Sequence, residues 1–529
     1  MSRMNFIKLS LVLATLATIF WSCNAHLSAG KQKVDNQSTM TDAKKPNIVF
    51  ILCDDLGYGE IQSLAPETSK IKTPHTDNLT REGMVFTDAH SGSAVCTPTR
   101  YGIMTGRYSW RTKLQRGVVQ GHAPNLIKEN RPTIANFLQN QDYHTAILGK
   151  WHLNFQYIDP VSNELIPKPK KSKKSKKSKK QLPPVGATIP DGPVQRGFDY
   201  YHGFHHAGDM KAVIENDKVI LHEDEINMLP RLTDKSVEYI NQQAKNKDGK
   251  PFFLYVPLGS PHTPILPSKE WQGKSGMGAY ADFVMQTDAT VGAIMKALAA
   301  NGLSENTLVI FSSDNGTSKA AKIPQLAEQG HLVSGGYRGS KSDLWDGGHR
   351  VPFIVKWPNV IKPGSTSEEL ICLTDIFATL SEITNKKLPS ESGEDSVSFL
   401  SALKGKKINS TRAGVIHHSI TGHFAYRLGK WKLLLAKGSG GWSSPREKES
   451  AGMPIAQLYN LETDPAETQN LYSTHPEIAE KLLEQLELDI KTGRSTKGEI
   501  SKNDVDKIIL WKTKNKKNKK GKKGKKKKN

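Results

Sequence analysis

The chain has 529 residues, and 36% of them are hydrophobic, which is enough to bury at least one large core. A chain that is disordered throughout is therefore excluded. The formal net charge of +22 is concentrated in two tracts, with nine lysines within 168–180 and twelve within 512–529. The remainder is close to neutral, so we expect no nucleic-acid partner. Four cysteines are too few for a disulfide scaffold in a chain of this length.

The N-terminus is typical of an export signal, which we assign to residues 1–23. A short basic segment precedes the apolar run 9–21, which is short for a permanent membrane span. Cleavage before Cys23 would leave a cysteine that carries a lipid anchor, whereas cleavage after Ala25 would give simple secretion. We expect the lipoprotein, and in either case an exported protein of the periplasm, outer membrane or cell surface. Residues 24–45 are polar and predict a flexible tether.

From residue 46 the sequence predicts an α/β domain that extends to residue 410. Four apolar runs rich in β-branched and aromatic residues are followed by polar residues: 47–53, 144–148, 252–258 and 307–312. Continuous apolar runs indicate strands that are buried on both faces, and helical patterns such as 282–300 lie between them. We therefore expect a large, mostly parallel sheet sandwiched by helices, with the lysine-rich segment 167–181 as a disordered insertion.

Polar side chains, most of them ionisable, occupy the ends of these predicted strands. They are Asp54 and Asp55, Lys150 and His152, His262, and Asp314 and Asn315. Ligands of parallel α/β sheets bind outside the carboxyl ends of the strands, so we expect these side chains to share one crevice. Three carboxylates and a carboxamide offer only oxygen, which suits calcium or magnesium better than zinc. Each motif alone is also a common turn sequence, and their recurrence favours a site.

The segment 96–107 reads CTPTRYGIMTGR, and its C-x-P-x-R core alone is short enough to occur by chance. Extended through Thr105, Gly106 and Arg107, it resembles the signature of the type I sulfatases of the alkaline phosphatase superfamily. In that family the cysteine is oxidised to formylglycine (3-oxoalanine) before the protein folds. Further segments match in the family's order: PNIVFILCDDLGYGE, LGKWHL, SPHTP, SSDNG and RGSKSDLWDGGHRVP.

The resemblance covers residues 46 to about 495 and implies an alkaline phosphatase-like fold. Two positions depart from the family pattern. Thr99 stands where serine is more usual, and Asp142 stands where the second signature commonly has glycine. Neither position is one at which the family carries out chemistry.

The resemblance also implies roles for individual residues. It places one calcium ion on five residues: Asp54, Asp55, Cys96, Asp314 and Asn315. Arg100 and Lys150 would hold the formylglycine, and His152 would take a proton from it. His262 and Lys341 would bind the sulfate, and one of them would protonate the leaving oxygen. A formylglycine-generating maturation enzyme is an implied partner.

These roles imply a calcium-dependent sulfatase that hydrolyses sulfate esters. The segment CTPTRYGIMTGRYSWRTKL resembles bacterial enzymes similar to arylsulfatase A and N-acetylgalactosamine-6-sulfatase, so we expect a sulfated glycan as substrate. Two alternatives stay open. One is a phosphonate or phosphate ester hydrolase of the same superfamily, and the other is a surface protein that binds polyanions and never has Cys96 converted.

Beyond residue 410 the pattern predicts a smaller domain, 411–511, made of an antiparallel sheet and a helix. Three segments support it: an alternating hairpin at 424–435 around Gly429-Lys430, a strand at 457–461 and an amphipathic helix at 475–492. A disordered lysine-rich tail, 512–529, follows. We expect the two lysine tracts to be solvated and without a function of their own. The alternative is that they hold a sulfated polyanion by electrostatic attraction.

Several other residues that could carry chemistry have ordinary explanations. Cys53 and Cys372 lie in apolar stretches and are expected in the core. His417, His418 and His423 form a cluster in the sequence but match no motif of the family. We therefore expect them not to contact substrate.

Overall fold

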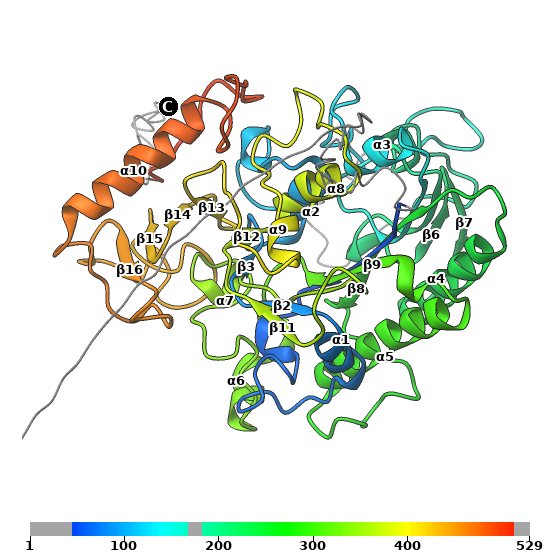
Figure 1. Ribbon diagram of the computed structural model, residues 1–529, viewed down its shortest axis with the longest axis horizontal. Helices are drawn as coiled ribbons and strands as arrows, with labels where there is room; N and C mark the ends of the chain where they lie inside the picture. Colours follow the sequence, from blue (N-terminus) through cyan, green and yellow to red (C-terminus); the bar gives the residue numbers. More distant parts are fainter. Residues whose placement is uncertain (1–44, 168–181, 513–529) are drawn as a thin grey trace, which may run out of the picture. The chain divides into compact units, whose positions relative to one another are not determined.

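The computed structural model describes residues 45–167 and 182–512 (Figure 1). The predicted signal sequence and lysine-rich tracts, and nearly all of the tether, lie outside these residues. The larger part of the described chain is built on a ten-stranded sheet. Its strand order is β11 (Ser365–Ser367), β2 (Met84–Phe86), β10 (Phe353–Lys356), β9 (Thr307–Ser313), β1 (Asn47–Asp54), β8 (Phe252–Pro261), β4 (His144–Lys150), β5 (Tyr200–Phe204), β6 (Ala212–Glu215) and β7 (Lys218–His222). The five central strands from β9 to β5 are mutually parallel, so the predicted mostly parallel sheet is confirmed.

Strand β1 shows why this sheet is buried on both faces. All eight of its residues are buried, and alternate side chains point to opposite sides. Phe50 and Leu52 belong to one hydrophobic cluster, whereas Ile51 and Cys53 belong to the other. Cys53 is therefore a core residue, as predicted.

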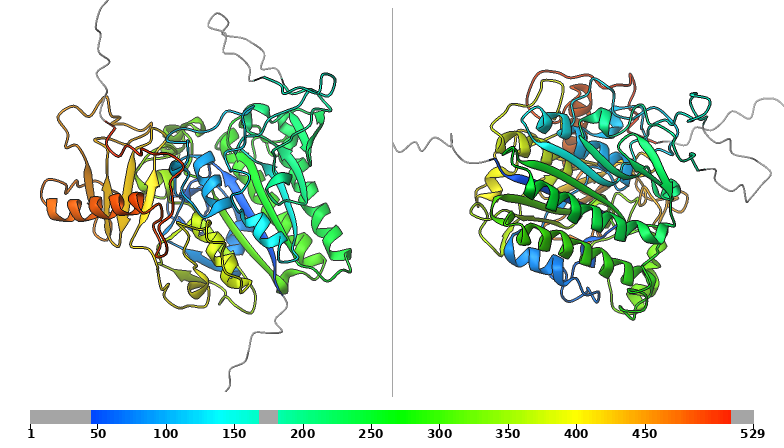
Figure 2. Two further views of the ribbon diagram at one scale, coloured as in Figure 1. Left: turned by 90° about the horizontal axis from the view of Figure 1, so that it is seen from above. Right: turned by 90° about the vertical axis from the view of Figure 1, so that its right-hand side faces the viewer.

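Helices cover each face of the sheet. One face packs against α1 (Pro74–Glu82), α4 (Met228–Lys245) and α5 (Ala279–Ala300), and α4 and α5 lie side by side in Figure 2. The other face packs against α2 (Cys96–Thr105), α3 (Ile134–Gln139), α8 (Ile376–Ile383) and α9 (Leu400–Leu403). Two short helices, α6 (Ile323–Glu328) and α7 (Asp346–His349), lie in the connections that follow β9. Among the described residues, no helix combines the length and apolar character that a bilayer span requires.

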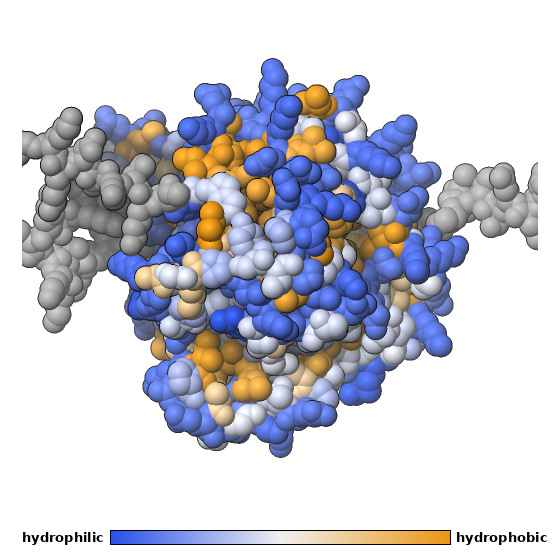
Figure 3. Space-filling model, turned by 90° about the vertical axis from the view of Figure 1, so that its left-hand side faces the viewer, coloured by the Kyte–Doolittle hydropathy of each residue, from blue (hydrophilic) through white to orange (hydrophobic). Residues whose placement is uncertain are grey.

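The C-terminal module, which we define as β13 to α10, contains the predicted small sheet and helix. Its four antiparallel strands are β13 (Val415–His418), β14 (Phe424–Leu428), β15 (Trp431–Leu434) and β16 (Gln457–Asn460), followed by α10 (Pro476–Lys491). Leu428 pairs with Trp431 across the predicted Gly429-Lys430 turn, in which Gly429 has a φ of 55°. The α10 side chains Leu482 and Leu486 pack against the sheet. Figure 3 shows this side of the molecule, where hydrophilic side chains surround separate apolar patches.

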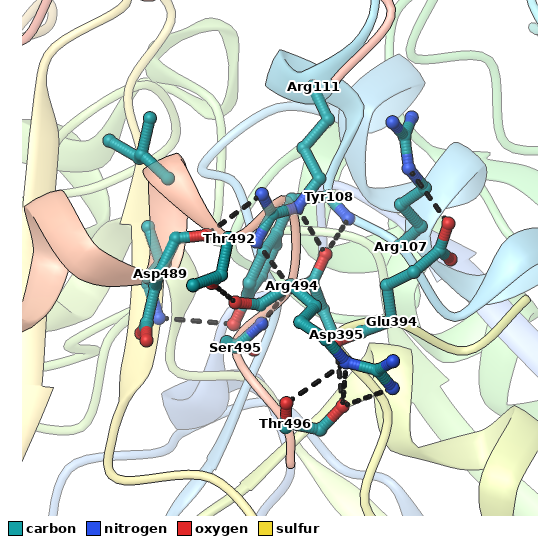
Figure 4. A network of polar contacts seen from close by, with 12 residues as sticks. Arg107, Tyr108, Arg111, Glu394, Asp395, Asp489, Thr492, Arg494, Ser495 and Thr496 are labelled. Carbon is teal, nitrogen blue, oxygen red and sulfur yellow. Dashed lines mark hydrogen bonds and ion pairs between the residues drawn. The ribbon is translucent and has the colours of Figure 1, made fainter. Parts of the chain in front are cut away.

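A buried polar network joins the C-terminal module to the segment that follows α2 (Figure 4). Arg111 forms a bidentate ion pair with Asp395, with N···O distances of 2.7 and 2.8 Å. The Arg111 Nη1 atom also donates to the carbonyl oxygen of Asp489 in α10, at 3.1 Å. Backbone N–H groups of Tyr108 and Ser495 complete the coordination of the Asp395 carboxylate. We call this set the Arg111–Asp395 network.

A two-stranded parallel sheet lies close to the same junction. It pairs β12 (Ile371–Cys372) with β3 (Ala89–His90). Cys372 is 1% exposed, so its predicted place in the core is confirmed.

Candidate active site

The carboxyl ends of the central strands bring the predicted side chains together. Asp54 ends β1, Lys150 ends β4, and Asp314 directly follows β9. Cys96 is the first residue of α2, and its sulfur and one carboxylate oxygen each of Asp54 and Asp314 all lie within 4.8 Å of one another. Asp54 and Asp55 form a second such group with His262, which follows β8. Residues that are 260 positions apart in the chain thus line one site.

Backbone contacts fix the two acidic strand ends to each other. The Asp314 N–H donates to the carbonyl oxygen of Cys53 at 3.1 Å, and the Asp55 N–H donates to Asp314 Oδ1 at 3.2 Å. Asp55 itself has a φ of 68°, a conformation that non-glycine residues rarely adopt. This turn allows two consecutive residues, Asp54 and Asp55, to place their carboxylates in the same site.

Each of the three carboxylates forms a close ion pair with a buried cation: Lys150 with Asp54, Lys341 with Asp55, and Arg100 with Asp314. Arg100 Nη2 also lies 3.7 Å from Asp54 Oδ1. Lys150 Nζ lies 2.5 Å from Asp54 Oδ2, and Arg100 Nη2 lies 2.8 Å from Asp314 Oδ2. Arg100 Nη1 also donates to the carbonyl oxygen of Lys150 at 3.1 Å, which orients the guanidinium between α2 and β4.

Burial and neighbouring charges shift the pKa values of these groups in opposite directions. Burial alone would raise the pKa of Asp54, but the positive charges around it, Lys150 foremost and then His262 and Arg100, together outweigh burial and hold that pKa well below its usual range. Burial and the negative charge of Asp54 raise the pKa of Asp314 to about 7. Burial also raises the pKa of the Cys96 thiol, so the unmodified side chain is protonated and a weak nucleophile.

Three oxygens of the site are buried without a hydrogen-bond partner among the described residues. They are Asp54 Oδ1, Asp55 Oδ2 and Asn315 Oδ1. The Asn315 Nδ2 atom donates to Asp55 Oδ1 at 2.8 Å, so the amide oxygen of Asn315 is turned the other way. A buried acceptor with no partner is unfavourable by about 1–3 kcal/mol, and a bound cation removes that penalty. An oxygen-only donor set of this kind fits a calcium ion.

His152 lies in the turn after β4 with a φ of 56°. Its Nε2 atom is 3.2 Å from the carbonyl oxygen of Val119, and its Nδ1 atom is buried without a hydrogen-bond partner among the described residues. Burial, followed by the positive charge of Lys150, lowers the pKa of His152 well below its usual value. The imidazole is therefore neutral and able to accept a proton.

The sequence did not predict a second group of ionisable side chains that adjoins His152. The imidazole of His152 lies 5.7 Å from that of His206 and 6.3 Å from that of His205, measured between ring centroids. His206 Nε2 is 3.4 Å from Asp209 Oδ2. His205, His206 and Asp209 follow β5 in the run HHAGD, which is not part of any of the sulfatase-like segments of the sequence. Only the proximity of β4 and β5 in the sheet reveals them as neighbours of the site.

His262 and Lys341 lie on the side of the site formed by Asp55. His262 Nε2 is 3.6 Å from Asp55 Oδ2, and its side chain is 18% exposed, the largest value among the predicted catalytic side chains that form ion pairs in the site. Burial lowers the pKa of His262. The backbone N–H of Lys341 donates to the carbonyl oxygen of Thr317 at 3.0 Å, which links the Lys341 loop to the segment after β9.

The remaining histidines of the sequence cluster are also buried. The His417 ring stacks on that of His349 at 3.8 Å and lies 5.0 Å from that of His90. His418 is 1% exposed and His423 is 6% exposed. These three rings therefore belong mainly to the packing between the C-terminal module and the rest of the chain.

Comparisons with known proteins agree with this architecture. The sulfatase family profile matches residues 46–386, and the profile described as "N-sulphoglucosamine sulphohydrolase, C-terminal" matches residues 340–492. An N-acetylgalactosamine-6-O-sulfatase of Bacteroides thetaiotaomicron is 30% identical over 517 residues, which cover 88% of this chain and 97% of that protein. Arylsulfatase A of Bos taurus is 29% identical and covers 88% of this chain and 90% of its own length.

A solved structure shows the same relationship. It comes from work on the metabolism of multiple glycosaminoglycans by Bacteroides thetaiotaomicron and superposes with a TM-score of 0.71 at 27% identity. The match covers 84% of this chain and 99% of the other.

Proposed function

We propose that this chain, which belongs to the sulfatase family of sulfuric ester hydrolases, removes sulfate from a carbohydrate by means of an oxidised Cys96 and a bound calcium ion. The observation that carries the proposal is the position of Cys96. Its sulfur lies within 4.8 Å of buried carboxylate oxygens of Asp54 and Asp314, at the ends of two parallel strands. A cysteine beside this acidic cluster is what a formylglycine-dependent sulfatase requires.

The calcium ion would be held by the five residues of the predicted set, Asp54, Asp55, Asp314, Asn315 and the modified Cys96. When bound, it would neutralise the negative charge that gathers around an attacking oxygen and a sulfate group. The three unpartnered oxygens of Asp54, Asp55 and Asn315 support this assignment.

Conversion of Cys96 would replace a protonated thiol with an aldehyde, whose hydrate carries two hydroxyl groups on one carbon. One hydroxyl attacks sulfur, and the bond between sulfur and the ester oxygen breaks. Arg100 and Lys150 are within reach to hold the modified side chain because both contact the carboxylates beside Cys96. The neutral His152 is suited to take the proton of the second hydroxyl, which releases sulfate and restores the aldehyde.

His262 and Lys341 would bind the sulfate oxygens and supply the proton that the leaving alkoxide needs. Both lie beside Asp55, where they could contact an anionic group. Lys341 keeps its charge, because its carboxylate neighbours, Asp55 foremost, outweigh burial and raise its pKa.

The substrate class follows from the relatives rather than from the site alone. One relative, which aligns with 88% of this chain, is an N-acetylgalactosamine-6-O-sulfatase. On that basis we propose that this chain also acts on a sulfated glycan. We also propose export, with Cys23 as a lipid-modified N-terminus, because the first 23 residues follow the signal pattern.

The deciding experiment is the intact mass of the proteolytic peptide that contains Cys96. Oxidation of the thiol to the aldehyde lowers the mass by about 18 Da. The same preparation should hydrolyse 4-nitrophenyl sulfate faster than a 4-nitrophenyl phosphonate ester. An unmodified cysteine in an inactive protein would favour the polyanion-binding alternative, and a strong preference for phosphorus would favour the phosphonate hydrolase.

A further inference from the structure

An exposed aromatic and cationic pair lies beside the loops that carry the site. Lys319 Nζ is positioned 5.1 Å from the centre of the Trp442 ring, within the range of a cation–π contact. Lys319 is exposed and Trp442 is half-buried. The two residues come from different parts of the fold: Lys319 follows β9, and Trp442 lies between β15 and β16 of the C-terminal module.

Hydrogen bonds fix Trp442 next to the Lys341 loop. Its backbone N–H donates to Ser342 Oγ at 2.9 Å and to Asp343 Oδ1 at 2.8 Å. The preceding Gly441 approaches this loop so closely that an added Cβ would lie 2.4 Å from Asp343 Oδ1 and from the carbonyl oxygen of Ser342. The Trp442 backbone is therefore held rigidly against Ser342 and Asp343, the two residues that follow Lys341.

Lys319 is attached to the same region through the other loop. It lies two residues after Thr317, whose carbonyl oxygen accepts the backbone N–H of Lys341. The same segment begins with Asp314 and Asn315 at the end of β9. Both members of the pair are thus connected by short, hydrogen-bonded paths to groups that we assign to metal and sulfate binding.

The polar groups of the pair are available to a ligand. Within the described residues, Lys319 forms no ion pair and the Trp442 indole N–H has no hydrogen-bond acceptor. A second pair with similar ring geometry is different: Lys274 Nζ lies 4.6 Å from the centre of the Trp271 ring, and Trp271 Nε1 donates to Glu270 Oε1 at 3.1 Å. The Trp271–Lys274 pair therefore serves as a matched control.

We propose that Trp442 and Lys319 bind the sugar that adjoins the sulfated residue of a polyanionic glycan. The inference rests on the proposed sulfatase function and adds a second saccharide position to it. On binding, the ammonium group of Lys319 moves from the Trp442 ring to a carboxylate or sulfate on that sugar. The indole face that it leaves packs against the apolar C–H face of the pyranose ring, and the indole N–H donates to a hydroxyl.

The test compares a monosaccharide with a short chain. Full-length protein with Cys96→Ala binds without turnover, and calorimetry measures its affinity for N-acetylgalactosamine 6-sulfate and for a chondroitin 6-sulfate tetrasaccharide. We expect the tetrasaccharide to bind at least about ten-fold more tightly, and Trp442→Ala to remove most of that difference. Lys319→Gln should lower the affinity for the tetrasaccharide by a smaller factor, and that factor should decrease as the salt concentration rises. Neither change should alter the affinity for the monosaccharide.

The control and the opposite outcomes separate this inference from the proposed function. Trp271→Ala should leave both affinities unchanged. Equal binding of the two ligands, or equal weakening of both by Trp442→Ala, would overturn the inference even if the wild-type protein hydrolyses 4-nitrophenyl sulfate. A wild-type protein with a converted Cys96 that hydrolyses no sulfate ester would instead overturn the function.

Discussion

Buried charged side chains gather near both ends of helix α2, and the aspartates of the two groups differ in how their oxygens are used. Near the N-terminal end, Asp54 Oδ1 and Asp55 Oδ2 are buried and accept no hydrogen bond within the described residues. Beyond the C-terminal end, each oxygen of Asp395 accepts two hydrogen bonds, from Arg111 together with a backbone N–H group. Both groups contain arginine–carboxylate pairs that are almost completely buried.

The difference separates a binding site from a structural joint. A buried carboxylate whose oxygens are all satisfied gains nothing from a further ligand, so the Arg111–Asp395 network holds the C-terminal module in place. Carboxylates that are crowded together with unsatisfied oxygens repel each other and favour a cation between them. Burial alone therefore does not identify the site, whereas unsatisfied oxygens beside a reactive side chain do.

The largest effect should come from the reactive side chain itself. Cys96→Ala should lower hydrolysis of 4-nitrophenyl sulfate roughly 10⁴-fold or more, because the nucleophile is lost. The thermal unfolding midpoint should change little, since the substitution removes only the small reactive group beyond Cβ. Cys372→Ala, at a buried cysteine remote from chemistry, should retain activity per folded molecule. A Cys96→Ala protein with wild-type rates would refute the proposed nucleophile.

Removal of divalent ions should affect only the group at the N-terminal end of α2. After exhaustive chelation, turnover should fall by at least about 100-fold, and added calcium should restore it. Calcium at 100 times its dissociation constant should also raise the free energy of unfolding by about 2.7 kcal/mol, which thermal denaturation can detect. Full activity after chelation would remove calcium from the proposal.

Substitutions in the Arg111–Asp395 network should change the stability of the protein and not its catalytic rate. Asp395→Ala leaves the Arg111 guanidinium buried without its partner and should lower the free energy of unfolding by about 3–5 kcal/mol. Activity per folded molecule should persist, as measured below the lowered unfolding midpoint. Asp224→Ala breaks an exposed ion pair with Lys211 and should leave the midpoint unchanged. An equal loss in both variants would contradict a structural role for the network.

The smallest expected effect concerns Asp489, on the edge of the same network. Burial raises its pKa to about 6. Below about pH 4 both the folded and the unfolded states hold the proton, and between about pH 4 and 6 only the unfolded state releases it, so stability falls as pH rises. Asp489→Asn should therefore be more stable than the wild type by about 1–2 kcal/mol above pH 6, and not at pH 4. Chemical denaturation at the two pH values checks this, and a pH-independent difference would contradict it.

The sequence predicts four of the five central strands well, because burial on both faces leaves continuous apolar runs, whereas β5 was not predicted. Strands β1, β4, β8 and β9 lie at the predicted places, with ends that differ by one to three residues. The short strand β13 was not predicted, since four residues that include two histidines show no clear period. Edge strands such as β11 carry even less signal, because their pairing partners lie far away in the chain.

The residues of the site also differ in how far the local sequence pattern predicts them. Asp54, Asp55 and Asp314 could be predicted because each lies within two residues of the end of an apolar run. Lys341 follows no strand of this kind, so only the family resemblance places it. Asp142 has a φ of 66°, which explains why glycine is common at that position of the signature.

The Arg111–Asp395 network also bears on the order in which the chain can close around Cys96. Arg111 bonds to the carbonyl oxygen of Asp489 and to Asn503 Oδ1, and its own carbonyl oxygen accepts the N–H of Asp504. These partners are synthesised nearly 400 residues after Arg111 itself. The segment after α2 therefore completes its contacts only when translation is almost finished. On the proposed function, this delay would give a maturation enzyme time to act on Cys96 before the chain has closed.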